Sequence, residues 1–388
     1  MLLTGCAKFS LPPLQNPGAV QSLQLTPVRF EYLLDWRRDD YTQVFATFLR
    51  SCNKILKQRT RGQLVTGFSV GNILDLQRVC QKALQDNIGN SSEKARLFFE
   101  TWFKLYQVSD GLNKQGLFTG YYEPQLRGSR RRSSIYNVAL YHRPPDLISA
   151  GLGQFRKGWS GQEISGRLNG SRLVPYASRS AIDRGALKGK GLELLWVDNA
   201  IDAFFLHIQG SGRVVLDTGE MVRVGFAGRN GQPYFAIGRD LVKRGIISKD
   251  KISLQTIRDW LERNPSQAID LMHKNKSYVF FRELKFLGSK TSDNNGPIGA
   301  SGVSLTPGRS LAVDRRYFAM GMPVWIDTSH PLTNDPLRRL MIAQDTGGAI
   351  LGPVRGDFFW GAGVEAREAA GRMKQAGQLY ILLPRPLR

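Results

Sequence analysis

The stretch Leu340-Met341-Ile342-Ala343-Gln344-Asp345-Thr346-Gly347-Gly348-Ala349-Ile350 joins an apolar run to a glycine-rich turn. Four apolar residues in a row are typical of a buried strand, and the two glycines predict a sharp turn directly after it. Asp345 therefore stands where a buried strand turns. Burial raises the pKa of a carboxyl, which makes this aspartate a candidate general acid. The alternative is a turn-capping aspartate, a common role for Asp before glycine.

Elsewhere in the sequence, the spacing of apolar residues changes near Gly116. Apolar residues spaced three and four apart predict helices over residues 39–57, 74–84 and 95–106. After Gly116, short runs between Gly, Pro, Asn and Ser predict strands, with helices at 234–245 and 253–263. The expected strands cover residues 117–122, 135–141, 192–197, 203–208, 213–216, 221–224, 278–284, 310–312, 323–326, 340–343 and 378–383. These patterns favour an α+β protein, mainly β with several helices, in mostly antiparallel sheets or a barrel.

The charge of the chain restricts its partners without choosing one. Lys and Arg number 54 against 32 Asp and Glu, a net charge of +22 that attracts nucleic acid, anionic lipid or a carboxylate-rich wall polymer. The densest basic run, Arg127 with 130–132, lies in a Ser/Gly-rich segment that is typical of a loop and has no interleaved aromatic residues. We therefore predict no nucleic-acid partner. The 388 residues suffice for two domains.

The N-terminus suggests attachment to a membrane from outside. Cys6 follows Leu3-Thr4-Gly5, which resembles the lipidation box of bacterial lipoproteins, and a Pro/Gly-rich stretch at 12–18 would serve as a tether. Only five residues precede Cys6, whereas an export signal needs an apolar core of about 7–15 residues. Either the true start lies upstream or the match is chance. We predict an exported protein, lipid-anchored at Cys6 to the periplasmic face of the outer membrane, or free in the periplasm. No window approaches the 18 apolar residues of a spanning helix.

Several classes of active site lack their sequence signature. No Cys/His/carboxylate spacing suits zinc, no glycine-rich dinucleotide or phosphate loop occurs, and Gly210-Ser211-Gly212 lacks the spacing of a serine nucleophile turn. We therefore predict neither a metal nor a cofactor. The remaining cysteines, Cys52 and Cys80, would either pair in an oxidising compartment or sit as small buried hydrophobic residues.

Two Asp-Thr-Gly triplets raise the possibility of an aspartic protease, which brings two such triplets together. They begin at Asp217 and Asp345. However, Asp217 lies between the apolar runs 214–216 and 221–222, which predicts a hairpin turn. The protease is therefore the weaker hypothesis.

Five motifs read together resemble the membrane-bound lytic murein transglycosylase A family, and they run in family order from about residue 117 to the end. They are Phe118-Thr119-Gly120-Tyr121-Tyr122-Glu123-Pro124, His207-Ile208-Gln209-Gly210-Ser211-Gly212, Ser277-Tyr278-Val279-Phe280-Phe281, Ala343–Ile350 and Gly356-Asp357-Phe358-Phe359-Trp360-Gly361.

The resemblance implies two β-rich domains, one inserted in the other, with a sugar-binding groove between them. Residues 30–124 and 277–388 would form an outer domain, a double-psi β-barrel whose C-terminal part is named for three aspartates (3D). Residues 125–276 would form the inserted, β-barrel-like domain, and residues 1–29 the lipoprotein-like tether.

The resemblance also implies an activity, cleavage of peptidoglycan between N-acetylmuramic acid and N-acetylglucosamine with formation of a 1,6-anhydro end. Asp345 would be the single acid/base, supported by Asp357, while Asp314 would be structural. The groove positions implied are Thr119, Gly120, Tyr121, Gln209, Ser211 and Gly347. Tyr121, Tyr122 and Trp360 could equally be core residues. Two alternatives stay open, a hydrolytic glycosidase using Asp345 with Asp357, and a non-catalytic wall-binding protein.

Overall fold

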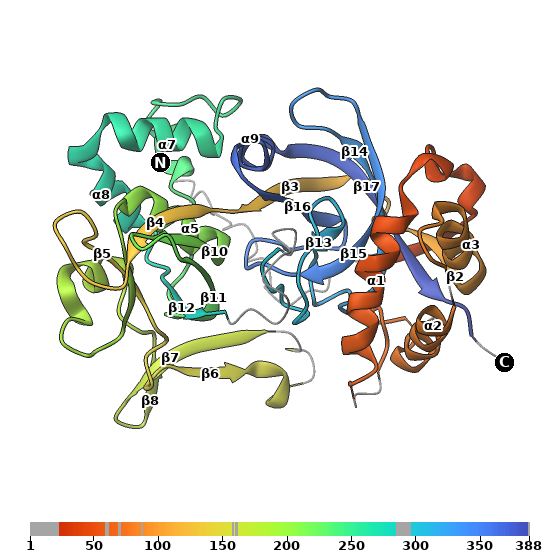
Figure 1. The fold of residues 1–388 in the computed structure, drawn as a ribbon, viewed down its shortest axis with the longest axis horizontal. Coiled ribbons are helices and arrows are strands. Elements are labelled where there is room, and N and C mark those ends of the chain that lie inside the picture. The colour runs from red at the N-terminus through yellow and green to blue at the C-terminus, as the bar shows by residue number, and fades with distance from the viewer. Residues whose placement is uncertain are drawn as a thin grey trace, which may run out of the picture.

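The computed structural model describes residues 23–386 except 59–61, 69–70, 87, 157–158, 160–161 and 285–295. Two large sheets with helices packed around them make up most of this part of the chain (Figure 1). The predicted class, mainly β with several helices, is confirmed. Cys6 and residues 1–22 of the predicted tether lie outside the described residues, whereas residues 23–28, also assigned to the tether, form a strand that pairs with residues 105–110.

The larger sheet combines strands from both ends of the described chain. Its strands are β1 (Leu23–Val28), β2 (Phe103–Asp110), β3 (Gly116–Glu123), β13 (Ser310–Ala312), β14 (Pro323–Ser329), β15 (Pro336–Asp345), β16 (Arg355–Ala362) and β17 (Lys374–Pro384). Their order in space is β1-β2-β17-β14-β15-β13-β16-β3, and a further pairing of β17 with β3 closes the last six into a ring. Most pairs are antiparallel, as expected, but β13–β15 and β16–β3 are parallel.

Three helices cover one side of this sheet, at the right of Figure 1: α1 (Tyr41–Ile55), α2 (Ile73–Gln85) and α3 (Ser92–Trp102). Their N-cap side chains are Asp40, Asn72 and Ser91, each of which accepts a backbone N–H of the first turn. The buried stripes of these helices share one core with the sheet.

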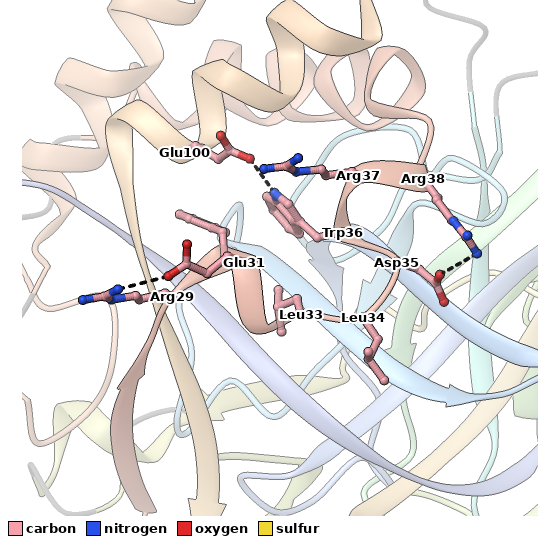
Figure 2. A pocket seen from close by; sticks show the side chains of 10 residues that line it. Arg29, Glu31, Leu33, Leu34, Asp35, Trp36, Arg37, Arg38 and Glu100 are labelled. Carbon is pink, nitrogen blue, oxygen red and sulfur yellow. Dashed lines mark hydrogen bonds and ion pairs between the residues drawn. The ribbon is translucent and has the colours of Figure 1, made fainter.

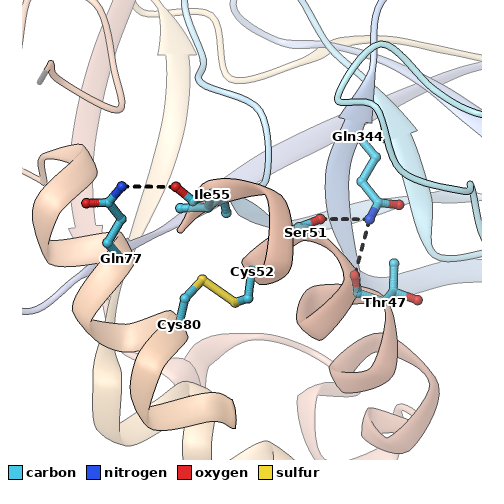
Figure 3. Close-up of a disulfide and its surroundings, with 7 residues drawn as sticks. All are labelled: Thr47, Ser51, Cys52, Ile55, Gln77, Cys80 and Gln344. Carbon is cyan, nitrogen blue, oxygen red and sulfur yellow. Dashed lines mark hydrogen bonds between the residues drawn. A yellow bond between two sulfur atoms is a disulfide. The ribbon is translucent and has the colours of Figure 1, made fainter. Parts of the chain in front are cut away.

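A disulfide between Cys52 and Cys80 ties α1 to α2 (Figure 3). Of the two possibilities that the sequence left open, the cysteines therefore pair. The bridge spans 28 residues of chain and stabilises the fold by roughly 3 kcal/mol in a chain-entropy estimate.

The third helix, predicted over residues 95–106, is shorter at its C-terminal end than expected. It ends at Trp102, and the chain continues directly as strand β2, whose residues pair with both β1 and β17. The aromatic residues around this point suit a helix stripe and a strand equally well. The deciding factor is the pair of neighbouring strands, which the local pattern does not contain.

The second large sheet consists of β4 (Gln125–Ser129), β5 (Val138–Tyr141), β9 (Glu193–Val197), β10 (Ser211–Leu216), β11 (Met221–Arg229) and β12 (Val279–Glu283). Its order is β12-β11-β10-β4-β9-β5, and the chain enters it directly from β3. A three-stranded sheet lies nearby, formed by β6 (Ile148–Gly151), β7 (Glu163–Asn169) and β8 (Arg172–Val174). The hairpin predicted at Asp217 is confirmed, because β10 and β11 pair on either side of it.

The second set of helices comprises α4 (Arg179–Ala181), α5 (Ala200–Gln209), α6 (Gly238–Lys243), α7 (Leu254–Arg263) and α8 (Pro265–Lys274), while α9 (Val364–Arg372) packs on the larger sheet beside β3 and β16. Shorter turns of helix occur at η1 (Phe30–Tyr32), η2 (Trp36–Arg38), η3 (Leu152–Gln154) and the π-helix Ile182–Ala186. The helix expected at 253–263 is confirmed with a capping box at Ser253, whereas the one expected at 234–245 is only six residues long.

The strand predicted at 203–208 is wrong, because these residues belong to helix α5. Asn199 caps the start of α5 by accepting two backbone N–H bonds, and Gly210 ends it in the left-handed conformation, with φ of 79°. The helix is buried by both the sheet and α7, so its apolar residues form a continuous run without the spacing of an amphipathic helix.

Candidate active site

Asp345 and Asp357 stand in one row across four neighbouring strands of the larger sheet. Ala312 of β13 pairs with Asp345 of β15 on one side and with Asp357 of β16 on the other, and Asp357 pairs with Thr119 of β3. Strands lie about 4.8 Å apart, so the Cα atoms of the two aspartates are separated by about 10 Å. The residue between the two aspartates in this row, Ala312, has only a methyl side chain and is buried.

The Asp345 carboxyl is held by neutral donors only. Its Oδ1 accepts the backbone N–H groups of Ala300 and Thr346, both at 2.9 Å, and its Oδ2 accepts the Tyr121 hydroxyl at 3.0 Å. Burial raises the pKa of Asp345, and the three hydrogen bonds lower it only in part. The side chain nevertheless keeps some exposure to solvent. Asp345 is thus a carboxyl group that is easier to keep protonated than usual and still reachable.

The residue before Asp345 fixes the end of the strand to α1. Gln344 is completely buried; its Nε2 donates to Ser51 Oγ at 2.8 Å and to the Thr47 carbonyl at 3.2 Å (Figure 3), and its Oε1 accepts Ser310 Oγ at 2.6 Å. Both ends of the amide are therefore satisfied inside the core. Because Gln344 cannot turn, the neighbouring Asp345 has a fixed backbone.

Asp357 has a cationic neighbour, unlike Asp345. Its Oδ1 accepts the hydroxyl of Thr119, and that hydroxyl also accepts Arg355 Nη2 at 2.7 Å. Burial raises the pKa of Asp357, and the charge of Asp345 raises it further, while Thr119 and Arg355 oppose the rise. The two aspartates therefore influence each other electrostatically.

The third aspartate, Asp314, is committed to structural contacts. Its carboxylate is buried and pairs with Arg316 at 2.6 Å, while accepting the backbone N–H groups of Arg316 and Gly352. It thereby joins the segment after β13 to the loop before β16.

Strand β3 presents two sets of residues on its two faces. Thr119 and Tyr121 lie on the face of the aspartates, as their hydrogen bonds show. Tyr122 is buried and packs with Trp360 and helix α9. A methyl group at Gly120 would stand 2.6 Å from Trp360 Nε1 and 2.9 Å from the Ala370 Cα, so this glycine allows close packing. The core interpretation thus holds for Tyr122 and Trp360 and not for Tyr121.

The second motif reaches the same strand from the second sheet. Gln209, the last residue of α5, accepts the backbone N–H of Tyr122 with its Oε1 at 3.3 Å, and Ser211 begins β10 two residues later. His207 is instead a core residue; it is buried against Tyr278, its Nδ1 accepts the Val279 N–H, and burial lowers its pKa well below the usual value. Gly347 lies exposed in the turn that follows Asp345.

A buried charge cluster joins the two sheets beside this site. Glu123, at the end of β3, pairs with Arg213 of β10 at 2.7 Å and with Arg223 of β11 at 3.4 Å. Arg223 also donates to the carbonyl of Gly296, four residues before the Ala300 N–H that holds Asp345. The position of Asp345 therefore depends on contacts from both sheets.

A cavity lies elsewhere on the described part of the protein. It has a volume of about 740 Å³ and opens beside η1 and η2, lined by residues 29–31, 33–38 and Glu100 (Figure 2). Its carboxylates are engaged: Glu31 with Arg29, Asp35 with Arg38, and Glu100 with the Trp36 indole at 2.7 Å. We assign the site by its chemistry, at Asp345. Within the described ranges, no group of His, Cys, Asp and Glu is arranged to hold a metal ion.

The sequence reasoning missed three contributors to the site. Ala300 and Thr346 act through backbone N–H groups, which carry no residue signature, and Arg355 acts through Thr119. Only Arg355 had a possible signal, since an arginine two residues from a motif aspartate on a strand shares its face.

Taken together, the fold and the site define a two-sheet α+β protein with two part-buried carboxyl groups of raised pKa in one row of the larger sheet. Two family descriptions match the chain, "MltA specific insert domain" over residues 117–282 and "3D domain" over residues 309–383.

Individual relatives agree with these matches. The chain is 31% identical over 283 residues to the membrane-bound lytic murein transglycosylase A of Vibrio cholerae, covering 70% of this chain and 67% of the relative. The crystal structure of a membrane-bound lytic murein transglycosylase from Agrobacterium tumefaciens superposes with a TM-score of 0.80 and 34% identity, covering 93% of this chain and 97% of that one. The MltA of Neisseria gonorrhoeae gives a TM-score of 0.76 at 33% identity, over 97% and 95% of the two chains. The chain belongs to the membrane-bound lytic murein transglycosylase A family, as the sequence motifs predicted.

Proposed function

We propose that this protein cleaves the β-1,4 bond between N-acetylmuramic acid and N-acetylglucosamine in peptidoglycan, without water, leaving a 1,6-anhydro end. Asp345 is its acid/base. The observation that carries the proposal is the set of donors around this carboxyl, which are all neutral and leave one of its oxygens available. Family membership supplies the class of substrate.

The acid step uses Oδ2 of Asp345. Because Oδ1 already accepts two backbone N–H groups, the proton of the neutral acid resides on Oδ2, which has only the Tyr121 hydroxyl beside it. The raised pKa keeps a larger fraction of this group protonated near neutral pH. Oδ2 gives its proton to the oxygen of the glycosidic bond as that bond breaks.

The base step uses the same oxygen. The Tyr121 hydroxyl donates to the new carboxylate, which then takes the proton of the muramic C6 hydroxyl as that hydroxyl attacks C1. A hydrolase needs a second carboxylate for its nucleophile or water, whereas internal attack needs none. Intramolecular attack removes up to roughly 7–11 kcal/mol of barrier in well-oriented cases.

The finer features of the fold are part of the proposal. The ring β17-β14-β15-β13-β16-β3 supports a double-psi β-barrel as the outer domain proposed for residues 30–124 and 277–388. The six-stranded sheet supports a separate β-barrel-like domain, proposed for residues 125–276, although its strand β12 lies beyond residue 276. The groove would run between them, lined by Thr119, Tyr121, Gln209 and Ser211. Gly120 and Gly347 would contribute backbone.

Location at a membrane outside the cytoplasm is also proposed. The Cys52–Cys80 disulfide is typical of an oxidising compartment, and the relatives are named membrane-bound. No helix among the described residues is both long and apolar enough to span a bilayer. A lipid on Cys6, at the periplasmic face of the outer membrane, would account for attachment; the intact mass of the mature protein tests it.

A hydrolytic glycosidase is the second candidate, because Asp357 shares the row of Asp345 and its pKa is also raised by burial. A non-catalytic wall-binding protein is the third. Mass spectrometry of digested sacculi separates the three: anhydro ends support the proposal, reducing ends support hydrolysis, and intact glycan supports binding alone.

A further inference from the structure

A cationic side chain of the second sheet, Arg229, lies next to the turn that follows Asp345. A methyl group placed on Gly348 would stand 3.3 Å from Nη1 of Arg229. Gly348 is three residues from Asp345 and is exposed, as is Arg229. The guanidinium therefore lies at the surface, beside the turn that follows Asp345, and reaches that turn from the second sheet.

The backbone under Arg229 is held firmly. The residue ends β11, where it pairs with Val279 of β12 just after an irregularity in register between Phe226 and Gly228. The next residue, Asn230, is completely buried; its amide donates to the carbonyls of Ala177 and Lys276 and accepts the Tyr278 N–H. Bulges and fixed ends of this kind aim a side chain. Arg229 thus projects from a rigid base.

The guanidinium of Arg229 has no anionic partner among the described residues. Two charged groups, Arg355 and Asp345, alter the pKa of Asp357. The raised pKa of Asp345 is opposed only by its three neutral hydrogen-bond donors. Arg229 is in neither set. Its charge is therefore not matched by either aspartate.

We infer that Arg229 binds a carboxylate of the glycan substrate and is a specificity-determining residue. The inference rests on the proposed function. Each muramic residue carries an acidic side group at C3, which ends in the lactyl carboxylate or continues into a peptide stem with carboxylates of its own. A planar guanidinium binds a carboxylate through two parallel hydrogen bonds, and Arg229 has these donors available. A glycan bound with its scissile oxygen at Asp345 would bring such a group past the Gly348 turn.

The test compares two forms of the same substrate. One is peptidoglycan with its carboxylates free, and the other is the same material after carbodiimide coupling to ammonia, which converts them to neutral amides. Release of anhydro ends is measured against substrate concentration at about 0.15 M salt, which screens long-range attraction to the basic protein. Stem-free glycan strands, treated in the same way, distinguish the lactyl carboxylate from the carboxylates of the stem.

Arg229→Gln should raise the apparent KM on the free-carboxylate substrate about tenfold, the scale of one charge-assisted pair, with kcat nearly unchanged. On the amidated substrate it should match the unaltered protein, and Arg229→Lys should fall between. Arg263→Gln, an exposed arginine at the end of α7, is the matched control and should behave as the unaltered protein on both. If Arg229→Gln loses the same factor on both substrates, the inference is wrong.

A second measurement keeps the inference separate from the proposed chemistry. Co-sedimentation with free and amidated sacculi, in an Asp345→Asn background, reads binding alone. The Arg229→Gln change should abolish the preference for the free form; an unchanged preference contradicts the inference. Failure of the unaltered protein to form anhydro ends would overturn the proposed function and leave this binding result valid.

Discussion

Asp345 ends β15 and Asp314 lies two residues after the end of the neighbouring parallel strand β13, yet their surroundings differ in charge. The segment after β13 leads to Asp314, which meets Arg316 at 2.6 Å. Strand β15 ends at Asp345, which meets two N–H groups and a tyrosine hydroxyl. A cation beside a carboxyl favours the ionised form, whereas burial among neutral donors makes protonation easier. The comparison teaches that two aspartates close together in one sheet can have different partners, a cation for Asp314 and neutral donors for Asp345.

The largest effect is expected from Asp345→Asn, which removes the only proposed acid/base. Turnover should fall by about 10³-fold or more, since acid–base groups contribute 10² to 10⁴. The measurement is the rate of anhydro-end formation on sacculi. A variant that keeps more than a tenth of the activity would move the acid away from Asp345 and break the comparison with Asp314.

The thermal stability of Asp345→Asn shows whether this variant still folds. The folded-state pKa of Asp345 is raised, so its ionised form costs stability above that pKa, and this cost is absent at acidic pH where both states are protonated. Asp345→Asn should therefore unfold at the same or a higher temperature at pH 7, with a smaller difference at low pH. Strong destabilisation at pH 7 would contradict the raised pKa.

The next largest effect is expected from Asp357→Asn. This variant distinguishes the proposed lytic mechanism, which uses Asp345 alone, from hydrolysis by Asp345 together with Asp357. If Asp357 only positions Thr119, its replacement should lower the rate about tenfold, which is the scale of one hydrogen bond to a charged group. As the second carboxylate of a hydrolase it should be worth at least about 10²-fold. Chromatography of the products gives a second reading: anhydro ends that persist in the variant favour the positioning role, and reducing ends in the unaltered protein favour hydrolysis.

A smaller effect, a few-fold, is expected from Tyr121→Phe. The hydroxyl donates to Oδ2 of Asp345 and so lowers the pKa of that carboxyl. Its removal should raise the pKa further, and the alkaline fall of the pH–rate profile, where the acid loses its proton, should move to higher pH. Tyr122→Phe on the opposite face is the matched control. A shift to lower pH in Tyr121→Phe would mean that the hydroxyl accepts from Asp345 instead.

The smallest effect on catalysis is expected from Asp314→Asn. The change weakens the pair with Arg316 and should lower the free energy of unfolding by about 1–3 kcal/mol, because a buried partner loses its charge. The rate per folded molecule should stay within about twofold of the unaltered protein. Chemical denaturation and activity at 20 °C check both halves; a large loss of rate without loss of stability would place Asp314 in the chemistry.

The sequence predicted the family and the class of fold well, because its motifs are contiguous and its helices have strong caps. Errors arose where distant residues decide local structure. Residues 203–208 form a helix because two layers bury it, and residues 103–106 form a strand because β1 and β17 flank them.

The candidate site was predictable only in part. Asp345 and Tyr121 lie in motifs, but nothing local indicates that Ala312 would stand between two aspartates or that Ala300 would donate to one of them. The limits of the domains and the roles of Thr119, Gln209 and Ser211 stay predictions. These contacts depend on the register between strands that are far apart in the chain. No single segment of the sequence determines that register.

Strand β17 determines when the ring of six strands can close during folding. It pairs with β14, β2 and β3, and Lys374 stands opposite Thr119, so the strand that holds Tyr121 gains its second neighbour from residues near the end of the chain. Such distant pairings form late and slowly. During synthesis and passage across a membrane, the ring would stay open until residues 374–384 arrive. Until then, the strand that holds Tyr121 would lack the neighbour that β17 supplies.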